Sequence, residues 1–380
     1  MFSIDLEQRC LLELLKASLF CTTPEIPDKV NWDKIFELAR SQCVVPLIAS
    51  YVPREFRDNW LNLTYQNKAH YMQLIHEQNS LVQLFKNNNI PFAILKGTAA
   101  AIYYPNPSLR TYGDIDFCVS NDFFDSAKSL LDNANYSFIS NNERQFVYKK
   151  NGIEFELHLK FSSKHYKNNI DHIVLNGLAN LQIYKVANNA FPGLSTYENG
   201  IVLLGHILQH LKESGIGLRQ IIDWMMFVHQ ELDDTSWEKH FRRLALEAGL
   251  EKLAITVTYM CKKWFQLPDS ITWCDKADED AANRLLIQIF EDGNFGLDRA
   301  PYEIIKKSIR DEGAFKYLQR SGMLNWPLAN KYIIFKPFAW FYQLCRYACI
   351  GISGLFNGKK IFSKTSHTMS LEELLKRLEQ

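Results

Sequence analysis

The spacing of hydrophobic residues changes twice along the chain. Through residues 1–88 apolar positions such as Leu74, Leu81 and Phe85 recur at helical spacing, and three Asn residues at 87–89 predict the end of the last helix. From about residue 195 the helical period returns and continues to the C-terminus, with breaks expected near Pro268 and within 293–302. Between these two regions the pattern is that of short strands.

Two apolar runs and one hairpin define the predicted strands. IPFAILKG at 90–97 and GDIDFCVS at 113–120 are short and apolar, which is typical of buried strands. TAAAIYYPNP between them predicts a short helix ended by Pro105 and Pro107, and NDFFDSAKSLLDNA predicts a helix after the second strand. Asn151 and Gly152 tolerate the positive φ angles of a type I′ turn, so RQFVYKKNGIEFELHLKF predicts a hairpin.

These patterns predict an α+β protein that is mainly helical. We expect an N-terminal helical region at 1–88, a small α/β core with a mixed sheet at 89–190, and a C-terminal helical domain at 191–380. With 380 residues, 47% of them hydrophobic, the chain is long enough for two or three folding units.

One C-terminal stretch, 332–356, is apolar enough to raise the question of a membrane. Lys336, Pro337 and Arg346 interrupt it, so it lacks the run of roughly 20 apolar residues that a spanning helix needs, and no stable membrane insertion is expected. A buried helix is the favoured interpretation, and contact with a membrane surface is the alternative.

Charge and cysteine content narrow the classes of function. Lys and Arg number 43 against 42 Asp and Glu, so the net charge of +1 gives no general attraction to nucleic acid or anionic lipid. The eight Cys include no Cys-x-x-Cys pair, and the N-terminus has no basic segment of the secretory type. We therefore expect reduced thiols and a cytoplasmic location. No pattern specifies an oligomeric state.

Asp114 and Asp116 place two carboxylates on one face of the second predicted strand, because alternate strand residues share a face. Two neighbouring carboxylates repel each other unless a cation lies between them, and Mg²⁺ prefers oxygen ligands that it shares with phosphates. A turn cap, a solvated strand edge and a structural ion pair are the alternatives. The metal site is favoured because the flanks are apolar and Lys96, Gly97 and Thr98 precede it.

Gly97 and Thr98 lie where the first predicted strand passes into a helix. Backbone N–H groups and the helix dipole attract phosphate at such a junction, and Gly leaves room for it. Thr98 adds a hydroxyl donor, and Lys96 or Arg110 adds positive charge for the leaving pyrophosphate. Glu156 adds a third carboxylate on the polar face of the hairpin. Three carboxylates on neighbouring strands are the arrangement of two-metal phosphoryl transfer, so the residues indicate nucleotidyl transfer.

Three segments together resemble a known family: FAILKGTAAAIYYPNPSLRTYGDIDFCV, IEFELHLKF and LLGHILQHLKESGIGLRQIIDWMMFV. They are similar to the DNA polymerase beta-like nucleotidyltransferase superfamily and, more narrowly, to the bacterial group called nucleotidyltransferase family 5, over about residues 30–230. The resemblance implies that Asp114, Asp116 and Glu156 bind metal and that Gly97 and Thr98 hold the phosphates. Thr98 departs from the usual Ser or Gly.

The reaction that the resemblance implies is transfer of a nucleoside monophosphate from an NTP to an acceptor hydroxyl, with release of pyrophosphate. It implies two Mg²⁺ ions, with Mn²⁺ as the alternative, and ATP is the default nucleotide. A small molecule or a protein is favoured over RNA as acceptor, because no RNA-binding motif is present. A catalytically silent nucleotide-binding or partner-docking module is the alternative function. The clustered anions argue against it, since a silent module has no reason to keep them.

For two positions of the second hairpin strand, the third carboxylate and His158, the sequence leaves two interpretations open. Glu154 shares a strand face with Glu156, and only the resemblance favours Glu156. His158 either orients a carboxylate or contacts substrate, or it is an exposed strand histidine without a site role.

Two helical pairs also keep two interpretations. His206 and His210 lie four residues apart, and buried or hydrogen-bonded histidines are favoured over zinc ligands because no third ligand is evident. Arg219 and Asp223 have the same spacing, which fits either an ordinary helix ion pair or accessory residues of the site.

Overall fold

The computed structural model describes residues 4–161, 169–213, 215–294, 313–325, 333–356 and 369–379. The chain divides into a larger unit, Met1–Leu297 with Met369–Gln380, and a smaller unit, Asp298–Thr368. The predicted mainly helical α+β class is confirmed.

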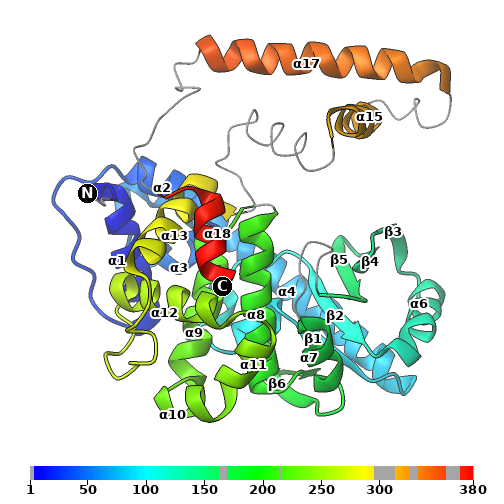
Figure 1. The fold of residues 1–380 in the computed structure, drawn as a ribbon, viewed down its shortest axis with the longest axis horizontal. Helices are drawn as coiled ribbons and strands as arrows, with labels where there is room; N and C mark the ends of the chain where they lie inside the picture. The colour runs from blue at the N-terminus through cyan, green and yellow to red at the C-terminus, as the bar shows by residue number, and fades with distance from the viewer. Residues whose placement is uncertain are drawn as a thin grey trace. The chain divides into compact units, whose positions relative to one another are not determined.

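A mixed seven-stranded sheet forms one side of the larger unit, with the strand order β3-β4-β5-β2-β1-β7-β6 (Figure 1). The strands are β1 (Phe92–Leu95), β2 (Ile115–Val119), β3 (Ser137–Asn141), β4 (Gln145–Lys150), β5 (Ile153–His158), β6 (Gln182–Val186) and β7 (Asn189–Gly193). The central strand β2 is antiparallel to β1 and parallel to β5. Every residue of β1 and β2 is buried, which confirms the two predicted buried strands.

Helix α4 (Arg57–Asn87) packs against the sheet through the apolar stripe that its sequence predicts. The ring of Phe85 lies 5.0 Å from that of Phe92 and 5.5 Å from that of Phe117, measured between ring centroids. The helix ends at Asn87, where the predicted stop lies. This packing closes one face of β1 and β2.

Helix α6 (Phe124–Asn133) packs in the same buried cluster as α4, and the other helices of the larger unit gather mainly on the other side of the sheet in Figure 1. These other helices are α1 (Leu6–Phe20), α2 (Trp32–Ser41), α3 (Val45–Ile48), α5 (Gly97–Ala101), α7 (Ile170–Gly177), α8 (Thr196–Lys212), α9 (Leu218–Glu231), α10 (Asp234–Ser236), α11 (Arg242–Glu247), α12 (Glu251–Phe265), α13 (Glu279–Asp292) and α18 (Leu371–Glu379). Short helical turns are η1 (Ala49–Tyr51), η2 (Arg54–Phe56), η3 (Pro107–Leu109), η4 (Asn121–Phe123) and η5 (Trp237–Phe241). Leu15 of α1 and Trp224 of α9 belong to one buried cluster. The region boundaries at 88 and 190 stay predictions.

The hairpin predicted around Asn151 and Gly152 is confirmed. Their φ angles are 49° and 84°, and β4 and β5 pair on either side of them. The pairing places Glu154 opposite Lys149, while on its other side β5 places Glu156 opposite Asp116 of β2. The hairpin thus brings one specific carboxylate beside the Asp pair.

The smaller unit contains α15 (Ala314–Asn325), η7 (Ile333–Phe335) and α17 (Lys336–Phe356). Phe338, Phe341 and Tyr342 of α17 are exposed, whereas Ala339 and Gln343 are buried, so the described part of this stretch is a partly exposed helix rather than a fully buried one. Among the described helices, none combines the length and apolar character needed to cross a membrane.

Candidate active site

A cavity of about 190 Å³ lies where the sheet of the larger unit meets its helices. The turn from β1 into α5, the loop before β2, the strand β5 and the helices α8 and α9 all contribute to its walls. Its lining residues are Lys96, Gly97, Arg110, Gly113, Asp114, Asp116, Asn142, Arg144, Gln145, Glu156, His158, His206, Gln209, His210 and Arg219. The cavity thus collects most of the predicted site residues.

Asp116 is held by two donors at the base of this cavity. Lys96 Nζ and His158 Nε2 each lie 2.6 Å from Asp116 Oδ1, and the Asp116 side chain is buried. Burial alone would raise the pKa of Asp116, but the charge of Lys96 and the hydrogen bond from His158 outweigh it and hold the pKa below its ordinary value. His158 is only 6% exposed, so the alternative of an exposed strand histidine is wrong.

Glu156 and Asp114 differ from Asp116 in that their pKa values are raised, so their ionised forms are unfavourable. Burial, followed by the charges of Asp116 and Asp114, raises the pKa of Glu156 to about 8. Burial and the charge of Asp116 also raise the pKa of Asp114. Glu154, by contrast, is exposed and lies opposite Lys149. Of the two candidates on β5, Glu156 is therefore the one that lines the cavity.

The structure separates the alternatives for the Asp pair. The central place of β2 in the sheet rules out a solvated strand edge. The ion pair between Lys96 and Asp116 is present, but it leaves Asp114 and Glu156 with raised pKa values. The positive charges of Lys96 and Arg219 therefore do not offset the burial and mutual repulsion that raise the pKa of Asp114, and the charge of Lys96 does not offset those that raise the pKa of Glu156.

The residues fit a divalent cation. One ligand atom each from Asp116, Glu156 and His158 lies within 4.8 Å of the other two, and Asp114 stands outside this close group as the described residues define it. Carboxylate oxygens suit Mg²⁺ and Mn²⁺, and an imidazole nitrogen adds affinity for a transition metal such as Mn²⁺. His158 was not predicted as a ligand. Its spacing of two residues from Glu156 on one strand face was the available signal.

The turn from β1 into α5 has unusual backbone geometry. Lys96 has φ 48° and ψ −133°, and Gly97 has φ 23°. Positive φ at a residue with a side chain is uncommon and stores strain, typically about 1–3 kcal/mol. The turn allows the lysine side chain to reach Asp116.

Thr98 turns its side chain away from the cavity. Its hydroxyl donates to Gln78 Oε1 of α4 at 2.6 Å, and the residue is 1% exposed. The hydroxyl of Thr98 is therefore not directed at the predicted phosphate site, and only the backbone N–H of Thr98 is left for a phosphate contact.

Arg110 forms a buried fork with Asp223. Arg110 Nε donates to Asp223 Oδ1 and Arg110 Nη2 donates to Asp223 Oδ2, each at 2.7 Å. Asp223 Oδ1 also accepts a hydrogen bond from the hydroxyl of Tyr104 at 2.7 Å. The partner of Asp223 is thus Arg110 rather than the Arg219 predicted from helical spacing. Arg219 Nη1 donates instead to the carbonyl oxygen of Thr111 at 3.2 Å. The fork ties the loop before Asp114 to α9.

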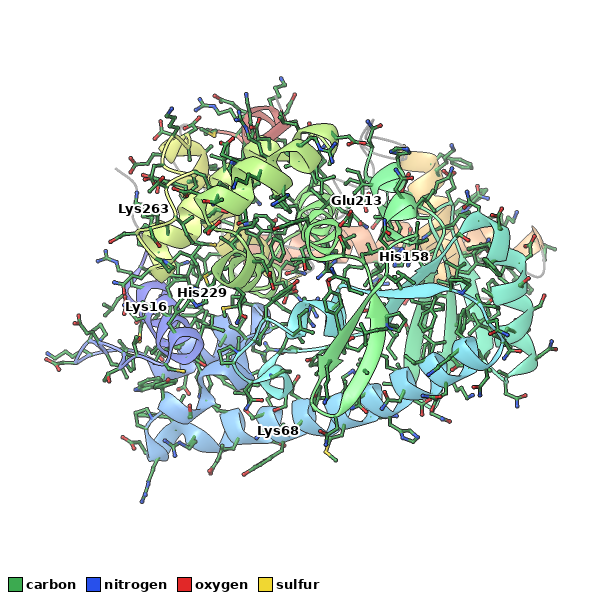
Figure 2. All side chains as sticks on the ribbon, turned by 90° about the horizontal axis from the view of Figure 1, so that it is seen from below. Lys16, Lys68, His158, Glu213, His229 and Lys263 are labelled. Carbon is green, nitrogen blue, oxygen red and sulfur yellow. The ribbon has the colours of Figure 1, made fainter. Side chains whose placement is uncertain are left out.

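Arg144 is a lining residue that the sequence did not indicate. It follows β3, and its Nη2 lies 2.9 Å from Glu213 Oε2 at the end of α8. Figure 2 labels His158 at the end of β5 and Glu213 beyond the end of α8. A charged residue in a turn gives no local signal of a site, and only the packing of α8 brings Arg144 to the cavity.

His206 and His210 form a hydrogen-bonded pair on α8, with 2.6 Å between their Nε2 atoms. Burial lowers the pKa of both, and with the charges of Lys96 and Arg219 it lowers that of His210 to about 3. The two histidines are hydrogen-bonded to each other, as the favoured interpretation expects, with His210 buried and His206 partly buried.

The buried pair predicts a stability that falls with acidity. The pKa of His210 in the folded protein lies below its unfolded value of about 6.5. The contribution of the neutral imidazole to the free energy of unfolding is therefore complete above pH 6.5 and is lost as the pH falls toward 3. The loss amounts to about 2 kcal/mol at pH 5. Because His210→Gln removes the titrating group, the free energy of unfolding of this variant relative to that of the unsubstituted protein should rise by about 2 kcal/mol when the pH is lowered from 7 to 5.

Urea unfolding at the two pH values measures this difference. The exposed His76 on α4 provides a control, as His76→Gln, in which no such change is expected. A pH-independent difference for His210→Gln would contradict the prediction.

Comparisons with known proteins place the chain in a family. Among similar solved structures, ANT(2″)-Ia in complex with adenylyl-2″-tobramycin has 10% identity and a TM-score of 0.29, covering 40% of this chain and 88% of that one. An antigenic nucleotidyltransferase-like protein from Paracoccidioides brasiliensis has 15% identity and a TM-score of 0.34, covering 52% and 94%. A search of curated proteins finds no match. The family described as "uncharacterised nucleotidyltransferase" matches residues 28–266, more than half of the chain, and the protein therefore belongs to that family.

Proposed function

We propose that the protein transfers a nucleoside monophosphate from an NTP, with ATP as the default, to an acceptor hydroxyl and releases pyrophosphate. The observation that carries the proposal is the set of Asp114, Asp116 and Glu156 in one cavity beside the turn at Gly97, with Asp116 buried and the other two carboxylates partly buried. Family membership supports nucleotidyl transfer as the reaction class. In a silent binding module, the free-energy cost of placing these carboxylates close together and away from water would not be offset by any catalytic role.

Asp114, Asp116 and Glu156 would hold the divalent cations, Mg²⁺ or Mn²⁺, and His158 is a further candidate ligand. Bound there, the cations would neutralise phosphate charge and favour ionisation of the acceptor hydroxyl. If His158 does not bind metal, its hydrogen bond to Asp116 orients that carboxylate.

The chain's own groups supply the remaining functions. Lys96 brings positive charge to the cavity next to the predicted phosphate site at Gly97. Arg110 is committed to Asp223, so in this proposal it positions the loop that carries Asp114. The carboxylate of Glu156 is the candidate acceptor for the proton of the attacking hydroxyl.

A thermal-shift titration with ATP, with and without Mg²⁺ or Mn²⁺, tests the proposal first. We expect stabilisation by nucleotide that requires the metal, worth about 2.7 kcal/mol at 100 times the dissociation constant. Equal stabilisation without metal would favour the silent module. Pyrophosphate release in the presence of candidate small-molecule and protein acceptors then tests transfer itself.

Gly97→Ala is expected to raise the dissociation constant of ATP at least about tenfold and to lower stability by about 1 kcal/mol. The stability cost arises because φ is 23° there, whereas the added Cβ would make only ordinary contact, 3.8 Å from the carbonyl oxygen of Asp114. The loss of affinity arises because the Cβ would occupy the path of a phosphate to the backbone.

Gly113→Ala is the matched control. Gly113 lines the same cavity, and an added Cβ there meets nothing within 4 Å. ATP titration by calorimetry compares the two variants. An unchanged affinity in Gly97→Ala would place the triphosphate elsewhere.

A further inference from the structure

Asp114 lies at the end of the loop that leads into β2, residues 108–114, whereas Asp116 is part of the sheet. Asp116 pairs with Leu95 of β1 and with Glu156 of β5, so strands on both sides fix its position. Asp114 comes one residue before β2, and burial and the charge of Asp116 raise its pKa. A loop that carries such a carboxylate tends to move it toward water unless other contacts hold the loop in place.

Helix α4 provides such contacts through two side-chain donors. The side-chain amide of Asn67 donates to the carbonyl oxygens of Ser108 and Arg110, at 3.0 and 3.1 Å. His70 Nε2 lies 3.2 Å from the carbonyl oxygen of Gly113, two residues before β2. Because a carbonyl oxygen only accepts, His70 is the donor in this contact. The loop is thus held at three of its backbone carbonyl groups, next to the carboxylate that it carries.

The same side of α4 continues to the turn from β1 into α5. Tyr71 packs on Tyr112 of the loop, with 5.2 Å between their ring centroids. Further along, Gln78 accepts the hydrogen bond from the hydroxyl of Thr98. Positions 67, 71 and 78 share one side of the helix, since they are separated by about one and two helical turns. One helix therefore contacts both loops that contribute to the cavity.

We infer that Asn67 and His70 are positioning residues, which hold the loop so that Asp114 faces the metal site. The inference rests on the proposed transfer reaction and extends it to two residues that are not among those lining the cavity. Arg110 already ties the same loop to α9 through Asp223, so α4 supplies the second attachment. Removal of residues that support a metal ligand typically changes metal affinity or activity by about 10–100-fold.

A titration of the full chain with Mn²⁺, without nucleotide, tests the inference, with the free ion measured by electron paramagnetic resonance. Asn67→Ala and His70→Ala are each expected to raise the Mn²⁺ dissociation constant about tenfold and to lower the transfer rate at saturating metal about tenfold. The dissociation constant of ATP at saturating Mn²⁺ should change less than about twofold, because the predicted phosphate contacts lie at the turn into α5.

Two further variants separate placement of the loop from general stability. His70→Gln keeps an N–H donor and should restore most of the Mn²⁺ affinity that His70→Ala loses. Asn79→Ala removes another hydrogen bond of α4, the one to Asn189 of β7, and should leave Mn²⁺ affinity unchanged. Its melting temperature should fall as much as that of Asn67→Ala, by no more than about 5 °C.

Hydrogen exchange of the metal-free protein gives a readout that involves neither metal nor nucleotide. Backbone amides of residues 108–116 should exchange at least about fivefold faster in Asn67→Ala and His70→Ala than in Asn79→Ala or the unsubstituted protein. Unchanged exchange would overturn the inference, and so would equal weakening of Mn²⁺ binding in Asn79→Ala. Absence of transfer in an unsubstituted protein that binds Mn²⁺ would contradict the proposed function alone, because Mn²⁺ affinity and exchange would still decide the placement of the loop.

Discussion

Asp116→Asn is expected to lower the rate of nucleotidyl transfer about 1,000-fold or more and also to lower the stability of the metal-free protein. Loss of a metal ligand removes several kcal/mol of charge stabilisation from the transition state, and about 4 kcal/mol corresponds to three orders of magnitude in rate. The stability falls because Lys96 and His158 both donate to this carboxylate, and an amide oxygen balances the charge of Lys96 poorly.

Asp114→Asn should lower the rate as strongly but raise the stability of the metal-free protein at neutral pH. The folded-state pKa of Asp114 is raised, so its ionised form is unfavourable in the fold, and this cost grows as the pH rises through that pKa. An uncharged Asn removes it. At Asp116 the folded-state pKa is lowered, so its contribution to stability is present above the unfolded value of about 3.9 and is lost as the pH falls.

Urea unfolding of both variants without metal, followed by single-turnover assays with Mg²⁺ and Mn²⁺, measures the two effects. The opposite signs of the stability changes distinguish a specific electrostatic role from general damage. Transfer at the original rate in either variant would show that the carboxylate is not part of the active site.

Glu156→Gln is expected to reduce the transfer rate about 100-fold or more while leaving the affinity for NTP nearly unchanged. Loss of a general base or of a carboxylate ligand has effects of this size. Glu156 lies opposite Asp116 in the parallel pairing of β2 and β5 and lines the cavity. Its role is therefore expected in the chemical step rather than in nucleotide binding.

Glu154→Gln is the control for this prediction, since Glu154 belongs to the same strand but is exposed opposite Lys149. Separate measurement of kcat and of the nucleotide dissociation constant distinguishes the two variants. If Glu154→Gln is damaging and Glu156→Gln is harmless, the assignment is reversed. If neither matters, the mechanism with three carboxylates fails.

The elements that the sequence predicts well depend on local chemistry. The end of α4 at Asn87, the turn at Asn151 and Gly152, and the buried strands β1 and β2 each follow from residues close in sequence. The strands β3, β6 and β7 were not predicted. All of β3 and most of β6 are exposed, and both lie at the edges of the sheet, so burial imposes no apolar pattern on them.

The sequence by itself determined which side chains share a face. The alternation of a strand places Asp114 with Asp116, and Glu154 with Glu156 and His158, before any packing is known. It also placed Lys96 and Gly97 at the end of the first strand. These features depend only on the local geometry of the backbone, which a few residues set.

Only the tertiary structure decided which of these groups meet. The parallel register of β2 and β5 selected Glu156 over Glu154, and His158 became buried because it lies against Asp116. Asp223 binds Arg110, which is 113 residues away in the chain, rather than Arg219 one helical turn away. A buried carboxylate is stabilised most by a two-pronged hydrogen-bonded partner, and the chain reaches such a partner only when distant segments pack together.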